Sequence, residues 1–191
     1  LYQESLGNVL TLDTHQAWIE VHTEMALPSP RSKPVCDVHL YLAVLKAGGM
    51  ELAIQKSVEL GVYAIFPVLM SRSVVKLTDD KMAAKQKRWQ SIADSAASQA
   101  GLVRCPVVHA PLPFKDLAAP WNSVSDEQPG ARFFCSEYEQ SVTFRKYESD
   151  IAQTRQLWVL TGPEGGLTQE ESNVLQKGGW HSVSFGPSIV R

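Results

Sequence analysis

The sequence predicts an α/β fold, in which a mainly parallel sheet is covered on both faces by helices. From residue 38 onward, short apolar runs typical of strands alternate with segments of helical periodicity. Glycines and a capping-box pattern mark the ends and beginnings of these helices. Ligands of such sheets bind in loops beyond the carboxyl ends of the strands, so these loops are the first candidates for a functional site.

The first 27 residues follow a different pattern. Apolar runs at residues 9–12 and 17–21 predict two strands, which cannot form a stable domain alone. We therefore expect residues 1–27 to be the C-terminal remnant of a small β domain. Residues 28–36 are rich in proline and predict a linker, which leaves residues 37–191 as the main domain. The chain does not begin with Met, and we expect that it starts inside a longer protein.

In the main domain the expected strands and helices follow one another in order. Strands are expected at residues 38–45, 64–69, 107–108, 132–135, 156–161 and 182–185. Helices are expected at residues 50–60 and 81–100, the second with Asp79 or Asp80 as its cap. A third helix is expected from Thr168, where the capping box begins, to Gly178. Residues 120–130 predict a polar loop.

The amino-acid composition limits the classes of protein to which this chain can belong. Hydrophobic residues make up 44% and charged residues 20%, which is ordinary for a globular protein. No apolar run approaches the roughly 20 residues needed to cross a bilayer, so we expect no membrane partner. Three distant cysteines fit reduced core thiols in a cytoplasmic protein better than disulfides, metal ligands or a nucleophile. The five histidines show no metal-ligand spacing, so no metal is expected.

The distribution of charge indicates a possible nucleic-acid surface. The formal net charge is only -2, but residues 71–104 hold seven basic and three acidic residues. A basic segment in a mildly acidic protein is typical of a surface that faces phosphates. A solvated helix face explains the same charges equally well, so both interpretations remain open.

Two loops could carry chemistry. Residues 162–166 (Gly-Pro-Glu-Gly-Gly) connect a strand to the capped helix, and their glycines allow a ligand to approach the backbone closely. The second loop, residues 186–188, follows the last strand. The common nucleotide signatures are absent from the sequence. Because the first loop contains Glu164 and no lysine, it suits a ligand with a cationic centre or adenosine-like groups better than a triphosphate.

Four stretches, in order, resemble the ribosomal RNA uridine-N3 methyltransferases of the SPOUT class (the RsmE type). Residues 46–62 resemble the family's Lys-Gly…Gln-Lys…Glu-Leu-Gly-Val helix, and residues 66–75 resemble its Pro…Arg-Ser strand and loop. Residues 88–101 resemble its Arg-Trp…Ala…Gln helix. Residues 160–167, followed by residues 184–191, resemble its two cofactor loops. The family continues beyond the point where this chain stops, and it carries Arg where this chain has Leu102.

The resemblance implies methylation of N3 of a uridine in small-subunit (16S) ribosomal RNA with S-adenosylmethionine as cofactor, and no metal. It also implies a C-terminal trefoil knot, a homodimer, and a PUA-like RNA-binding barrel of which residues 1–27 are the remnant. The implied cofactor-binding residues come from the two loops: Leu160, Thr161, Gly162, Pro163, Glu164, Gly165, Ser184, Phe185, Gly186, Pro187, Ser188 and Ile189.

For catalysis we favour Arg72, which could stabilise a uridine oxyanion or hold a phosphate; a surface or interface arginine is the alternative. The expected RNA-binding residues are basic: Arg72, Lys76, Lys85, Arg88 and Arg104. Two other functions remain open. One is a non-catalytic RNA-binding or ribosome-assembly protein of the same fold, and the other is a SPOUT methyltransferase that acts on another RNA.

Overall fold

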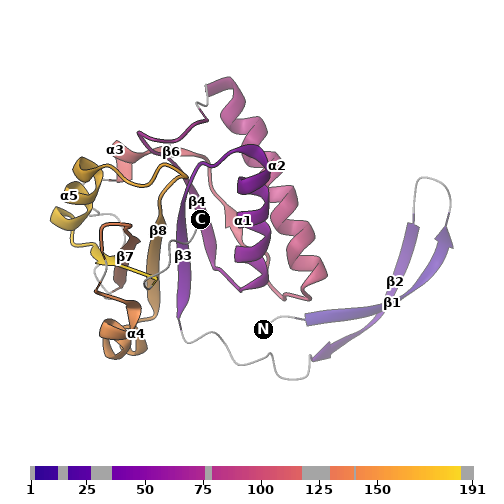
Figure 1. Cartoon of the computed structure of the whole chain (residues 1–191). Coiled ribbons are helices and arrows are strands. Elements are labelled where there is room, and N and C mark those ends of the chain that lie inside the picture. The colour runs from indigo at the N-terminus through magenta and orange to yellow at the C-terminus, as the bar shows by residue number, and fades with distance from the viewer. Residues whose placement is uncertain are drawn as a thin grey trace. The chain divides into compact units, whose positions relative to one another are not determined.

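A computed structural model describes residues 3–12, 17–26, 36–75, 79–117, 130–139 and 141–185 (Figure 1). The chain divides into two compact units, Leu1–Pro34 and Val35–Arg191. In the first unit, β1 (Gln3–Leu12) and β2 (Ala17–Ala26) form an antiparallel pair with two register shifts. Both strands are longer than the sequence pattern predicted. The identity of this unit as a domain remnant stays a prediction.

The second unit is built on a parallel sheet. Its strands are β3 (Asp37–Ala43), β4 (Ala64–Leu69), β5 (Val107–Val108), β6 (Leu112–Pro113), β7 (Ala131–Cys135), β8 (Gln156–Thr161) and β9 (His181–Val183). Their order is β5-β4-β3-β8-β7-β9, and β6 pairs with β4. Each pairing is parallel. The predicted fold class, a mainly parallel α/β sheet with helices, is therefore confirmed.

Two long helices cover one face of this sheet. They are α1 (Ala47–Glu59) and α2 (Asp79–Gln99), which lie side by side in Figure 1. Met50, Ile54 and Val58 of α1 recur at helical spacing, and all three are fully buried. They join Trp89 of α2 in a cluster with the even-numbered residues of β3, such as Leu42. Burial of this apolar stripe holds both helices on the sheet.

The opposite face has its own core. Here the odd-numbered Tyr41 and Ala43 of β3 pack with Trp158 and Leu160 of β8. The covering elements are α3 (Phe114–Leu117) and α5 (Gln169–Lys177), and Leu175 of α5 is buried against this face. A short helical segment, η1 (Phe144–Tyr147) followed by α4 (Glu148–Gln153), leads into β8.

Local signals explain most of the helix boundaries. Thr168 caps α5: its Oγ1 accepts a hydrogen bond from the backbone N–H of Glu171 (3.1 Å), as the capping box predicted. Gly178 and Gly179 end this helix, and Gly179 takes the left-handed φ of 82° that favours glycine. Several expected bounds were wrong in detail. Helix α1 begins three residues earlier than residue 50, and α2 begins at Asp79, so Asp79 and Asp80 are its first residues and not the cap before it.

Candidate functional site

The loops that follow three neighbouring strands, β4, β3 and β8, meet at one edge of the sheet. In the sheet β3 lies between β4 and β8, and the register pairs Leu42 of β3 with both Pro67 and Thr161. The three strands therefore end at the same edge. The chain order reverses at β3, because β4 and β5 follow on one side while β8 and β7 lie on the other. Ligands of open parallel sheets bind at such a reversal.

The loop after β8 is folded back on itself. The backbone N–H of Gly166 donates to the carbonyl oxygen of Pro163 at 2.8 Å, which closes a tight turn. Gly166 has a φ of 68°, and a Cβ atom there would meet the carboxylate of Glu137, so only glycine fits without rearrangement. A Cβ atom on Gly165 would lie 3.3 Å from the Cβ of Arg72. We call residues 162–167 the Gly162 loop.

Arg72 contacts this loop directly. It lies in the turn after β4, where the N–H of Ser73 donates to the carbonyl oxygen of Met70 at 3.1 Å. Its Nη1 donates to the carbonyl oxygens of Gly165 (2.9 Å) and Leu167 (3.2 Å). Arg72 thus holds the backbone of the Gly162 loop with one nitrogen. Its place at the carboxyl edge fits the predicted contact with substrate, which stays a prediction.

Two carboxylates, one in the Gly162 loop and one in α5, make further hydrogen bonds at this edge of the sheet. Glu164 is exposed, and its Oε1 accepts a hydrogen bond from the backbone N–H of Lys46, which precedes α1, at 3.1 Å. Glu171 is only 3% exposed and accepts from the N–H groups of Ser71 (2.9 Å) and Thr168 (2.8 Å). The pattern of the sequence identified Glu171 only as part of a helix cap. Its bond to Ser71 joins residues 100 positions apart, and no local pattern signals it.

The predicted cofactor residues of the first loop lie together at this edge. Leu160 is buried in the core, and Thr161 ends β8. The hydroxyl oxygen of Thr161 is buried, and it has no hydrogen-bond partner within the described part of the chain. Buried polar groups are usually paired, so this hydroxyl is an exception among the described residues.

The second predicted loop is described only at its start. Ser184 is buried, and its N–H donates to the carbonyl oxygen of Val142 at 2.7 Å. Phe185 is 61% exposed. Gly186, Pro187, Ser188 and Ile189 lie outside the described residues. Their role in cofactor binding therefore stays a prediction.

The expected RNA-binding residues do not gather at one edge. Arg88 of α2 forms an ion pair with Glu51 of α1, with 2.7 Å between Nη2 and Oε1. Arg104 donates to the carbonyl oxygen of Tyr63 (3.0 Å), and its guanidinium lies 3.4 Å from the centre of the Tyr63 ring. Tyr63 precedes β4, so Arg104 lies at the edge opposite Arg72.

Two lysines complete the set of expected RNA-binding residues. Lys85 is half-buried on α2, and Lys76 lies outside the described residues. Among the described residues no group of three or more His, Cys, Asp or Glu side chains could hold a metal ion. No helix in the described ranges is long and apolar enough to cross a membrane.

All three cysteines are free thiols, and their surroundings suppress ionisation. Burial and a hydrogen bond from Sγ to Oδ1 of Asp94 (2.9 Å) raise the pKa of Cys105 to about 11. Burial raises the pKa of Cys135 to about 12, and burial likewise raises the pKa of Cys36. A reactive thiolate requires the opposite shift. These side chains are therefore poor nucleophiles.

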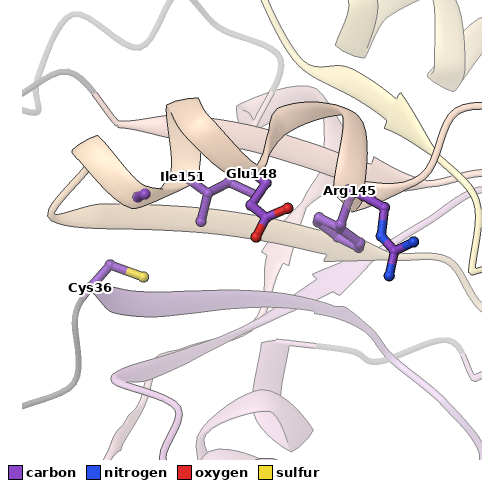
Figure 2. A pocket seen from close by; sticks show the side chains of 6 residues that line it. Cys36, Arg145, Glu148 and Ile151 are labelled. Carbon is purple, nitrogen blue, oxygen red and sulfur yellow. The ribbon is translucent and has the colours of Figure 1, made fainter.

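A shallow hollow of about 500 Å³ is lined by residues outside the Gly162 loop and outside the turn that holds Arg72 (Figure 2). It runs from Cys36, just before β3, along η1 and α4, where Arg145, Glu148 and Ile151 line it. The candidate site is therefore the set of joined loops at the carboxyl edge.

Comparison with known proteins gives a consistent result. A family model of the RNA methyltransferase domain matches residues 31–191. A Bacillus subtilis protein named ribosomal RNA small subunit methyltransferase E is 32% identical over 154 residues, which are 81% of this chain and 60% of that protein. The protein of the same name from Mesomycoplasma hyopneumoniae is 31% identical over 163 residues, 84% of this chain and 66% of that protein.

The solved structures agree with the sequence comparison. A crystal structure of a ribosomal RNA small subunit methyltransferase E from Neisseria gonorrhoeae, bound to S-adenosyl methionine, has a TM-score of 0.83 and 26% identity. The match covers 99% of this chain and 73% of that one. The chain spans less than two thirds of the length of the two curated relatives above. It belongs to the RNA methyltransferase domain family, and the predicted resemblance to the ribosomal RNA small subunit methyltransferase E proteins is confirmed.

Proposed function

We propose that the protein transfers the methyl group of S-adenosylmethionine to N3 of a uridine in small-subunit ribosomal RNA. The observation that supports this most is the set of joined loops at the carboxyl ends of β4, β3 and β8, in a member of an RNA methyltransferase domain family. Two relatives are named for small-subunit ribosomal RNA, and a solved relative has S-adenosyl methionine bound.

The residues of the Gly162 loop fit such a cofactor. The buried hydroxyl of Thr161, directly before this loop, lacks a hydrogen-bond partner in the described ranges and would pair with a polar group of the cofactor. The loop offers a carboxylate, Glu164, which suits a sulfonium cation better than a phosphate. The backbone of residues 160–165 would hold the cofactor on one side, and residues 184–189 would hold it on the other. When bound, the cofactor supplies a methyl group on a sulfur that is itself the leaving group.

The chain's own residues orient and activate the acceptor. N3 of uridine is a poor nucleophile while it carries its proton, so the reaction needs that proton removed and the ring aligned with the methyl group. Arg72 lies beside the Gly162 loop and is exposed. Its guanidinium would stabilise negative charge on a uridine oxygen. No thiol takes part, in keeping with the raised pKa values of the cysteines.

The rest of the architecture is part of the same proposal. The family resemblance implies a C-terminal trefoil knot as part of the fold. The separate β1–β2 unit supports a PUA-like remnant that binds RNA. Because Arg88 is paired with a carboxylate and Arg104 lies at the edge opposite the Gly162 loop, we expect Arg72, Lys76 and Lys85 to contribute more to RNA affinity. The homodimer and the cytoplasmic location follow from the family resemblance.

The test is methyl transfer from labelled S-adenosylmethionine to small ribosomal subunits by the whole protein. Digestion of the RNA to nucleosides should then yield labelled N3-methyluridine. Label in another nucleoside would assign the enzyme to another RNA target. Complete absence of transfer by a folded protein would favour a non-catalytic RNA-binding role, which the names of the relatives do not favour.

A further inference from the structure

Glu171 has more partners than a helix cap requires. Its Oε2 accepts a hydrogen bond from the N–H of Thr168 (2.8 Å), which completes the capping box of α5. Its Oε1 accepts a second hydrogen bond, from the N–H of Ser71 at 2.9 Å. Only the first bond contributes to the helix. The second joins α5 to the turn after β4, in a side chain that is only 3% exposed.

The bonds of Glu171 and of Arg72 connect the turn of residues 70–73 to the Gly162 loop and to α5, which follows it. Ser71 and Arg72 occupy the middle of the turn that the Ser73 N–H to Met70 carbonyl bond closes. Glu171 holds this turn through the Ser71 N–H, and Arg72 reaches back to the carbonyl oxygens of the Gly162 loop. The turn and the loop are therefore connected twice, once by a carboxylate and once by a guanidinium.

The two connections differ in strength because they differ in exposure. Arg72 is exposed, so solvent and salt weaken its bonds to the loop. Glu171 is buried, and its two bonds from backbone N–H groups are charge-assisted in surroundings that screen charge poorly. The position of the turn, and with it that of Arg72, depends mainly on the buried carboxylate.

We propose that Glu171 is a positioning residue for the cofactor site. It fixes the turn of residues 70–73 against the Gly162 loop, so that Arg72 and the loop backbone keep the arrangement that the cofactor and the uridine require. The inference rests on the proposed function, since Glu171 would maintain the geometry of that same cofactor site.

Two substitutions break the Ser71 bond from opposite ends. Glu171→Gln has nearly the same shape, but it has one acceptor oxygen, so it cannot accept from both N–H groups. Ser71→Pro removes the N–H itself. Ser71 is the second residue of its turn, a position that tolerates the fixed φ of proline. We expect each variant to raise the Kd for S-adenosylmethionine about tenfold.

The double variant provides an internal check. Because both changes remove one shared interaction, their effects on the Kd should not add. We expect the double variant to raise the Kd by less than the product of the two single effects. Full multiplication of the two effects would show that Glu171 and Ser71 act independently, and it would contradict the proposal.

Thr168→Ala is the matched control for loss of the helix cap. It removes the hydroxyl that accepts from the Glu171 N–H, but it leaves the Thr168 backbone N–H and both bonds of the Glu171 carboxylate. We expect a lower urea midpoint, since the cap is weakened, and a Kd within about twofold of the wild-type value. A loss of affinity equal to that of Glu171→Gln would mean that Glu171 acts only through helix stability.

The measurement is calorimetric titration of the whole protein and its variants with S-adenosylmethionine, alongside urea unfolding. Binding by the wild type, weakened in Glu171→Gln and Ser71→Pro but not in Thr168→Ala, supports the proposal. Binding by the wild type that all variants retain would overturn the role of Glu171 and leave the proposed function intact. No binding by a folded wild type would overturn both.

Discussion

Substitution of Gly165 by valine tests how closely the Gly162 loop packs against Arg72. A Cβ atom at this position would lie 3.3 Å from the Cβ of Arg72, and 3.6 Å from both its Cδ and its carbonyl oxygen. Alanine needs only a small shift of the arginine. The two further methyl groups of valine need more room than the contact allows, so we expect the Arg72 side chain to be displaced.

The size of the effect follows from the bonds that are lost. Displacement of Arg72 breaks its hydrogen bonds to the carbonyl oxygens of Gly165 (2.9 Å) and Leu167 (3.2 Å). Hydrogen bonds to a charged group contribute roughly 1.5–3 kcal/mol each when they are shielded from water. Because Arg72 is exposed, we discount the pair to about 1 kcal/mol in total. That free energy corresponds to a Kd for S-adenosylmethionine raised about fivefold.

The assay compares Gly165→Val and Gly165→Ala with the control Gly48→Val. A Cβ atom on Gly48 would have no neighbour within 4 Å, so the same substitution there should leave the affinity unchanged. We expect a graded loss, small for alanine and large for valine at residue 165. Equal affinity of Gly165→Val and wild type, measured on folded protein, would refute the proposed packing between the loop and Arg72.

Three further predictions concern stability and reactivity. Gly130→Ala should lower the free energy of unfolding in urea by about 1–3 kcal/mol, because the added methyl group meets the buried ring of Trp158; an unchanged midpoint would contradict this. Cys135, with a pKa raised to about 12, should resist alkylation at about pH 8 until urea unfolds the chain. Burial lowers the pKa of His39 and His109 below their ordinary 6.5, so the unfolded chain takes up protons first on acidification. The free energy of unfolding should have its full value above about pH 6.5 and should fall below that pH, less steeply in His109→Gln. A urea midpoint that does not change with pH would disprove this.

The elements that the sequence predicted correctly are those whose formation depends on local signals. The strand expected at residues 156–161 coincides with β8, because a run of apolar residues is bounded by turn residues at its end. Thr168 and Glu171 form both hydrogen bonds of the predicted capping box. The short elements β6, α3, η1 and α4 were missed, since each has six residues or fewer and shows too little periodicity.

Sequence patterns do not predict the contacts of the site that join residues far apart in the chain. The bond between Glu171 and Ser71 depends on the adjacency of β4 and β3 in the sheet and on the place of α5 beside their ends. Arg104 belongs to a basic segment by its position in the sequence, yet it stacks on Tyr63 at the opposite edge. Arg104 contacts the residue before β4 and Arg72 follows the end of β4, so the length of this one strand separates them.

The most direct test of the central claim is calorimetric titration of the whole, folded protein with S-adenosylmethionine, repeated in the presence of S-adenosylhomocysteine. A cofactor site at the carboxyl edge predicts saturable binding that the demethylated product competes away. A folded protein that releases or absorbs no heat, and that shows no rise in melting temperature with the cofactor, would contradict the methyltransferase account.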